Sequence, residues 1–331
     1  MIRVLRAANT ALILGLVTAA SLAETPAWPS RPITIVAPAP AGGLTDQLAR
    51  TLAHQLQQQT ALPIVVDNRP GMSGTVGTVH VAKGTADGSL LMITNAGTHA
   101  IAPFMVGNVG FDTMKDFTHL AMLGGSSWAL VVAADSPHLT FTEWLVWAQA
   151  QSQSVTIGTP GDGSHGHLIG ETLARARSVK WSHVPYKGAA NVLADVVGGH
   201  VQAGWVTTSS AIPLTRSGRL RALLVTSPRR LPDFPGVPTA KEAGVPMLTA
   251  FIWFGLAAPH GMDAAMRTAI QRAVGKAMAT ADWRDRMAAV GIEPVDVTPE
   301  QTEAFVGAEV QRWAPLARSL AASRPASSQR P

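Results

Sequence analysis

The chain has 331 residues, 47% of them hydrophobic and 14% charged, a composition that supports a large buried core and excludes a disordered chain. The absence of cysteine excludes disulfides, a thiol nucleophile and a lipid-anchored cysteine, and the length allows two domains of ordinary size. The formal net charge is +5, but the basic residues are scattered and lack interleaved aromatics, so we expect no nucleic-acid binding.

The first 23 residues have the pattern of a secretory signal peptide. Arg3 and Arg6 precede an apolar run over 8–20, and Ser21 and Ala23 place small residues at the −3 and −1 positions of a cleavage site. We therefore expect cleavage near Ala23 and a secreted mature protein. A membrane anchor is the alternative, and it is disfavoured because the apolar run is shorter than the roughly 20 residues that a spanning helix needs.

Apolar runs of strand length alternate with amphipathic segments along the rest of the chain. Leucines at 44, 48, 52 and 56 recur every four residues and so mark one face of a helix. Strands are predicted within 33–37, 63–71, 89–100, 128–137, 183–188, 220–227 and 251–261, helices within 44–56, 74–84, 140–151, 189–201, 263–279 and from 298, and a strand–turn–helix unit over 154–177. Strands separated by helices predict parallel sheets covered on both sides, in two α/β domains.

Helix starts are marked where a threonine is followed three residues later by Glu or Gln. This capping-box pattern occurs at 140–143, 239–242 and 298–301, and Pro299 strengthens the last because proline suits the first helical position. The tail from Ala322 is rich in Ser, Pro and Arg, and we expect it to be disordered.

Glycine-rich turns between a strand and a helix recur in each half of the chain, and they are the candidate binding sites. Three have the right form, at 38–46, 95–99 and 159–167. The first amides of a helix lack intrahelical partners and carry partial positive charge, and glycine lets an anion approach them closely. A turn without lysine or arginine therefore suits a carboxylate. A connection in which glycine only relieves steric strain is the alternative, and Asp46 is assigned to bracing the turn or to water-mediated contacts.

The last of these turns also brings together Asp162, Ser164 and His165, the residue types of a hydrolase triad. Triad members normally come from separate segments, and no Gly-x-Ser-x-Gly elbow occurs, so a polar turn that caps the following helix is favoured. His165 and His167 stand two residues apart without a zinc-binding pattern around them. We therefore expect no metal and no other cofactor.

Several long stretches match a known family in order, from about Trp28 to Trp313. They include WPSRPITIVAPAPAGGLTDQLAR, VVDNRPGMSGTVGTVHVAKGTADGSLLMI, IGTPGDGSHGHLIGE, HVPYKGAANVLADVVGGHV and VPTAKEAG. In these stretches the chain resembles the periplasmic substrate-binding receptors of tripartite tricarboxylate transporters, the Bug family.

The resemblance implies an α/β, two-domain periplasmic-binding-protein fold of type II-like architecture, with two sheets, a ligand cleft and two hinge crossings. The crossings are expected near 129–131 and 253–255. The implied division of the chain is a signal peptide at 1–23, a discontinuous domain 1 at 24–129 plus 254–331, and domain 2 at 130–253.

The resemblance also implies a small carboxylate ligand held by backbone amides, small hydroxyls and bridging waters rather than by an arginine. The implied ligand contacts are Pro38, Ala39, Ala41, Gly42, Gly43, Thr45, Asp46, Asn95, Gly97, Thr98 and His99 in domain 1, and Thr159, Gly161, Gly163, Ser164, His165, Tyr186, Thr207 and Ser209 in domain 2. Many relatives have an aromatic residue where Ala39 stands, so this cleft is expected to differ in width or packing. The far end of the ligand and the roles of His99 and His165 stay open.

The favoured function is a monomeric periplasmic receptor without catalytic activity, which delivers its carboxylate to membrane transporter subunits. A binding protein that feeds a sensor kinase, and a secreted hydrolase that uses Ser164 and His165, are the alternatives.

Overall fold

The computed structural model describes residues 28–60, 62–105 and 107–323. The predicted signal peptide and its cleavage site lie outside these residues, and so does the predicted tail apart from Ala322 and Ser323, which end the last helix. In chain order the elements are β1 Ile33–Ala37, α1 Leu44–Gln57, β2 Ile64–Asn68, η1 Met72–Gly74, α2 Thr75–Ala82, β3 Leu90–Asn95, η2 Gly97–Ile101, α3 Ala102–Met105, β4 Phe117–Ala133, α4 Phe141–Ala150, β5 Val155–Thr159, α5 His165–Arg177, β6 Trp181–Pro185, α6 Ala189–Val197, β7 Ala203–Thr207, α7 Thr208–Arg216, β8 Leu220–Val225, η3 Pro246–Leu248, β9 Phe251–Pro259, α8 Ala264–Met278, α9 Ala281–Ala289, η4 Pro299–Gln301 and α10 Thr302–Ser323.

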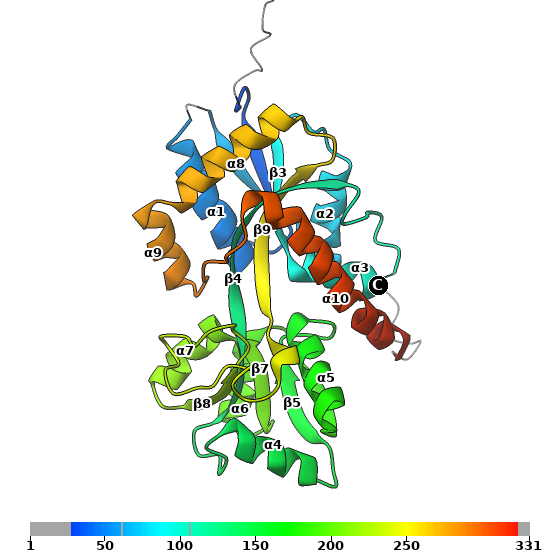
Figure 1. The fold of residues 1–331 in the computed structure, drawn as a ribbon, viewed down its shortest axis with the longest axis vertical. Helices are drawn as coiled ribbons and strands as arrows, with labels where there is room; N and C mark the ends of the chain where they lie inside the picture. Colours follow the sequence, from blue (N-terminus) through cyan, green and yellow to red (C-terminus); the bar gives the residue numbers. More distant parts are fainter. Residues whose placement is uncertain (1–27, 61, 106, 324–331) are drawn as a thin grey trace, which may run out of the picture.

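Two long antiparallel strands, β4 and β9, run through the middle of the molecule and connect an upper and a lower lobe (Figure 1). Their ladder extends from Phe117 paired with Pro259 to Ser127 paired with Phe251. The expected two sheets are present, β2-β1-β3-β9-β4 in the upper lobe and β4-β7-β5-β6 in the lower lobe, with β8 also paired to β4. They share β4 and so join into one curled sheet. The predicted domain boundaries at 129/130 and 253/254 fall on these two strands and stay predictions.

Because of the strand directions, the turns that follow the strands of one lobe face those of the other lobe. β1 and β3 are parallel, and because β3 is antiparallel to β9 and β9 to β4, both run in the same direction as β4. β7 is antiparallel to β4 and parallel to β5. β4 passes from the upper lobe into the lower, so the carboxyl ends of β1 and β3 point towards the lower lobe. The carboxyl ends of β5 and β7 point towards the upper lobe, and ligands of α/β sheets bind at such ends.

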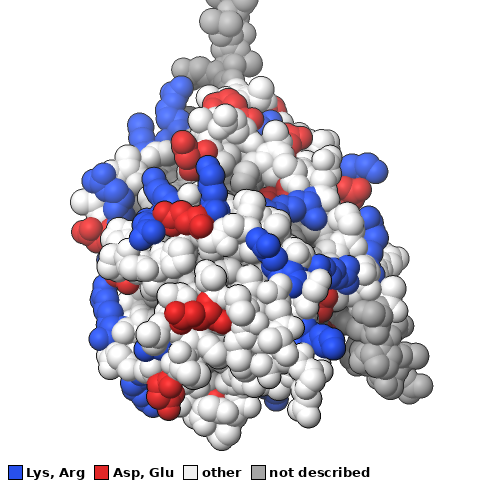
Figure 2. Space-filling view, turned by 60° about the horizontal axis from the view of Figure 1, so that its bottom comes forward, with Lys and Arg blue, Asp and Glu red and all other residues white. Residues whose placement is uncertain are grey.

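The surface carries charges of both signs in alternation. On the face shown in Figure 2, Lys and Arg side chains are scattered, and several lie beside Asp or Glu. In the lower lobe, for example, Arg230 Nε lies 2.9 Å from a carboxylate oxygen of Glu242. This face therefore has no broad basic surface of the kind that nucleic acids require.

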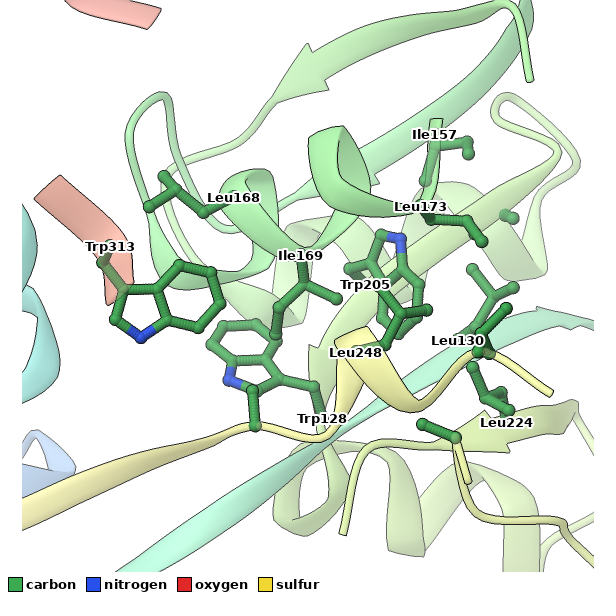
Figure 3. Packing of buried hydrophobic residues seen from close by; sticks show 14 of the residues in the cluster. Trp128, Leu130, Ile157, Leu168, Ile169, Leu173, Trp205, Leu224, Leu248 and Trp313 are labelled. Atoms are coloured by element: carbon green, nitrogen blue, oxygen red, sulfur yellow. The ribbon is translucent and has the colours of Figure 1, made fainter. Parts of the chain in front are cut away.

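Each lobe has an apolar core, and a further cluster joins the two. Leu48 of α1 packs with Ile35 and Ile270 in the upper lobe, and β4, β7, β8 and α6 enclose a core in the lower lobe. The joining cluster brings Trp313 of α10 against Trp128 of β4 and the first turns of α5 (Figure 3). The C-terminal helix therefore packs against both lobes at the level of the hinge strands.

Most predicted elements are confirmed, and the differences have local causes. The capping box at 140–143 starts α4, and that at 298–301 precedes α10. The box at 239–242 forms its hydrogen bonds but starts no helix, because Gly244 has φ of +74° and Pro246 follows. Strand β4 begins at Phe117, eleven residues before the predicted start at Trp128. The sequence reading missed β7, α7 and α9, of which α7 contains Pro213.

Because Trp313 is 3% exposed and joins the lobes, we expect Trp313→Ala to lower the free energy of unfolding by about 3 to 5 kcal/mol. Urea unfolding followed by far-UV circular dichroism measures this loss. Trp147→Ala is the matched control. Trp147 is a half-buried residue of α4, and His138 is its only aromatic neighbour among the described residues, so this variant should lose less free energy of unfolding. Equal losses in the two variants would contradict the joining role of Trp313.

Candidate functional site

The turn after β1 is braced from below by a buried carboxylate. Asp46 is 3% exposed and accepts hydrogen bonds from the amide of Gly42 (2.8 Å), Asn68 Nδ2 (2.9 Å) and Arg50 Nε (3.0 Å). Burial alone would raise the pKa of Asp46, but the bonds from Arg50, Gly42 and Asn68 outweigh it and lower that pKa below its ordinary value. Asp46 therefore fixes the turn, as its position in the sequence predicted.

The helix that follows this turn begins without a side-chain cap. Gly43 is the N-cap residue of α1, with φ of −72°, and its own amide donates to the carbonyl of Pro40 at 3.3 Å. Within the described residues, no acceptor bonds the amides at 44–46. Ala41 and Gly42 are exposed beside them. The first turn of α1 thus offers main-chain donors to an anion, with partial positive charge from the helix dipole.

The turn after β3 is closed by its own hydrogen bonds. Asn95 Oδ1 accepts from the amide of Thr98 at 3.0 Å, and the Thr98 hydroxyl lies 2.8 Å from His99 Nδ1. His99 is 0% exposed and its ring packs against Phe117 and His119. Burial, and secondarily the neighbouring His119, depresses the pKa of His99 well below the ordinary value. The side chain of His99 is therefore enclosed in the first lobe, and its expected contact with a ligand stays a prediction.

The second-lobe turn after β5 is organised around two histidines. Ser164 caps α5 by accepting from the amide of His167 at 3.2 Å, and the amide of Gly163 donates to His167 Nδ1 at 3.0 Å. The hydroxyl of Thr159 lies 2.7 Å from His183 Nε2. Burial, and next the adjacent His167, lowers the pKa of His183 to about 4. Thr159, Ser164 and His167 therefore hold the turn together through hydrogen bonds of their side chains.

His165 lies in an apolar environment at the junction of the lobes. Its ring sits 4.6 Å from Trp313 and 5.8 Å from Trp128 between centroids, and neither ring nitrogen has a hydrogen-bond partner within the described residues. Burial and the charge of Arg312 lower the pKa of His165 to about 3. His165 therefore does not line an open ligand surface, contrary to expectation. It also forms no base–nucleophile pair with Ser164, which a hydrolase would need.

Asp162, His167 and His183 bring potential metal-ligand atoms within 4.8 Å of one another. The two imidazoles are stacked, with centroids 3.7 Å apart and planes inclined by 16°. Because imidazole lone pairs lie in the ring plane, two parallel rings at this spacing cannot aim both at one ion. The amide of Gly163 moreover uses Nδ1 of His167. The cluster acts as a brace of the turn.

The turn after β7 resembles the turn after β1 in that the helix that follows it begins without a side-chain cap. Thr207 is the N-cap residue of α7 and makes no side-chain cap bond, and its hydroxyl lies 3.0 Å from that of Ser209 and 2.8 Å from that of Ser210. Ser209 abuts Gly291 in the loop after α9. Tyr186 donates its hydroxyl to Asp195 at 2.6 Å, and burial, with that bond next, raises the pKa of Tyr186 to about 12. Its hydroxyl is thus already engaged.

The expected ligand contacts fall into two groups by exposure. The exposed or half-buried ones are Ala39, Ala41, Gly42, Gly43, Gly97, Gly161, Gly163, Ser164, Tyr186, Thr207 and Ser209. The buried ones are Pro38, Thr45, Asp46, Asn95, Thr98, His99, Thr159 and His165. Within the described ranges, no hydrogen bond joins the first-lobe set to the second-lobe set. Cavities at Arg312 and Trp313, and at Arg229 and Glu293, lie elsewhere.

A curled sheet with two lobes whose strand ends face each other defines a two-lobed periplasmic binding protein. Residues 48–321 match the model of the tripartite tricarboxylate transporter family receptor. The chain belongs to this family. No helix among the described residues has the length and apolar character to cross a bilayer.

Three relatives illustrate the match. BugT of Bordetella pertussis is 33% identical over 89% of this chain and 91% of its own. The structure of R. palustris Rpa4515 with adipate is 31% identical, covers 89% of this chain and 98% of its own, and has a TM-score of 0.76. MatC of Rhodopseudomonas palustris with bound malate is 28% identical, covers 87% and 99%, and has a TM-score of 0.72.

The buried neutral His165 predicts acid-sensitive stability. Its folded-state pKa of about 3 lies below the unfolded value of roughly 6.5, so only the unfolded chain takes up the proton between these values. This contribution is complete above pH 6.5 and is lost as the pH falls towards 3.

We expect His165→Phe, which keeps a ring between the two tryptophans, to lose less stability than the wild type on acidification. The difference should grow by up to about 1.4 kcal/mol per pH unit below pH 6. Urea unfolding between pH 7 and 4 measures it, and parallel profiles of the two proteins would show that His165 is not held neutral.

Proposed function

We propose that this chain is exported to the periplasm by its N-terminal segment, captures a small carboxylate between its two lobes as a monomer, and delivers it to the membrane subunits of a tripartite transporter. The observation that carries the proposal is the row of uncapped amides at 44–46, placed where the strand ends of the two lobes face each other. The adipate and malate in the structures of two relatives support a carboxylate ligand.

Main-chain donors can grip a carboxylate without a formal charge on the protein. The turns 38–46, 95–99 and 159–167 contain no lysine or arginine, so the donors are helix amides and small hydroxyls. Hydrogen bonds to an ionised acceptor are about twice as strong as neutral ones, and they strengthen when the site closes and water leaves. We expect affinity for anions with modest salt dependence, because no full side-chain charge is neutralised.

Capture requires that the lobes close on the ligand. We propose that the chain divides into 24–129 plus 254–331 and 130–253, and that it bends near 129–131 and 253–255 on β4 and β9. A ligand shifts an open–closed balance only by its differential affinity for the closed form. Donors in the first-lobe turn and in the turn after β7 give the closed form its higher affinity. One carboxylate, or the waters that bridge to it, can contact both turns only when the lobes approach each other.

Mass spectrometry of small molecules released from the denatured, purified protein tests the proposal. It should detect a carboxylate, and that compound should raise the melting temperature of the ligand-free protein. A cationic ligand would contradict the proposal. Turnover of chromogenic esters that Ser164→Ala abolishes would instead favour the hydrolase.

Gly43→Val should weaken carboxylate binding at least tenfold while changing the free energy of unfolding by less than about 1 kcal/mol. The φ of −72° suits valine, and a Cβ would lie 3.3 Å from the Pro40 carbonyl oxygen, a tight but tolerable contact. The isopropyl group would crowd the approach to the amides of α1. Isothermal titration calorimetry and urea unfolding measure the two quantities.

Gly236→Val is the matched control, because Gly236 is exposed and a Cβ there would meet nothing within 4 Å. It should leave affinity unchanged. If Gly43→Val bound the carboxylate with wild-type affinity, the first turn of α1 would not be part of the ligand site.

A further inference from the structure

The loop between β2 and α2 has an unusual backbone. Gly71, Met72, Ser73 and Gly74 all have positive φ, at 120°, 47°, 56° and 88°. Among the described residues, only Ser178 joins Met72 and Ser73 as a non-glycine residue of this kind. Side chains disfavour this region, so the conformation persists only where surrounding structure imposes it, and such strain is concentrated at functional sites.

The C-terminal part of this loop packs against the two first-lobe turns. A Cβ on Gly74 would lie 2.5 Å from Thr98 Cγ2 and 2.9 Å from the carbonyl oxygen of Pro38, and one on Gly77 would lie 3.1 Å from Pro38 Cβ. Pro38 and Thr98 belong to the two first-lobe turns described above. The loop is therefore pressed against both turns and forms a third segment at the same end of the first lobe.

Several side chains in and after this loop are exposed or lack a hydrogen-bond partner within the described residues. Met72 is 54% exposed and Val76 is 47% exposed, although most large apolar side chains of this protein are buried. Thr75 is 4% exposed, and its hydroxyl has no hydrogen-bond partner within the described residues. A methionine is flexible and polarisable, which suits contact with apolar groups of varied shape.

We propose that Met72 and Ser73 are specificity-determining residues that contact the ligand beside the amide site and select carboxylates with an apolar body. The amides at 44–46 hold the acid group, and Met72 covers the methylene chain behind it. Packing of the loop against the turns that contain Pro38 and Thr98 holds it in place before the ligand arrives. This inference rests on the proposed function.

A series of dicarboxylates from malonate through adipate tests the selectivity. Each added methylene should tighten binding to the wild type about threefold to fourfold, as burial of a CH₂ predicts, and Met72→Ala should reduce this to less than twofold. Met247→Ala is the matched control, since Met247 is a second exposed methionine, 41% exposed on η3, and belongs to none of the ligand turns. The inference would be overturned if affinity rose with chain length as steeply in Met72→Ala as in the wild type, or if the wild type showed no such rise.

Ser73→Gly and Ser178→Gly separate the proposed ligand contact from stability. Both replace a left-handed serine by the residue that suits this conformation, so both should raise the melting temperature, but Ser178 lies at the C-terminal end of α5. Only Ser73→Gly should weaken adipate binding, by about threefold or more, because it removes the side chain that contacts the ligand. Unchanged adipate affinity in Ser73→Gly would contradict that contact.

Oxidation footprinting locates the contact directly. Saturating adipate should slow hydrogen-peroxide oxidation of Met72 at least fivefold and leave Met247 unaffected, as read by peptide mass spectrometry. If adipate binds and Met72 stays unprotected, this inference fails and the proposed function survives. If no member of the series binds the wild-type protein, this inference fails, and the proposed function is decided separately by the compound released on denaturation.

Discussion

The antiparallel pair β4–β9 is the constraint on which the rest of the architecture depends. Its ladder runs from Phe117 paired with Pro259 to Ser127 paired with Phe251, and β4 continues into the lower lobe, where it pairs with β7 and β8. The direction of every other strand is therefore set relative to this pair. Because β1 and β3 follow β4 while β5 and β7 oppose it, the helix starts of the two lobes must meet at the same level. A pair of strands is also easily bent, and a small change there moves whole lobes.

Where the helix starts of the two lobes meet, the hydrogen-bond donors on offer are mainly main-chain amides. The turns are small and uncharged, and the side chains around them, such as Asp46 and His167, hold the main chain in place rather than reach outward. An arginine would bind many anions strongly even in an open site. Fixed main-chain amides bind tightly only a ligand whose shape fits the closed site, from which water is excluded. The chain belongs to the receptor family, and two of its relatives were solved with the carboxylates adipate and malate.

Sequence reading recovered the elements whose signals are local. The leucine spacing of α1 and the capping box of α4 need only neighbouring residues, and the glycine-rich turns were found the same way. It failed where distant segments decide. His99 and His165 look like ligand contacts in the chain, yet rings from remote positions enclose both. The length of β4 and the strained Met72–Ser73 backbone likewise follow from pairing and packing that no local pattern encodes.

The most direct measurement is a crystal structure of the mature protein with the carboxylate that it retains. The account predicts carboxylate oxygens within about 2.7 to 3.2 Å of main-chain nitrogens at the start of α1, directly or through one ordered water, with the second-lobe turns closing the other side. An acid group paired instead with an arginine, such as Arg229 in the cavity beside β4 and β9, with the α1 amides facing bulk solvent, would contradict it.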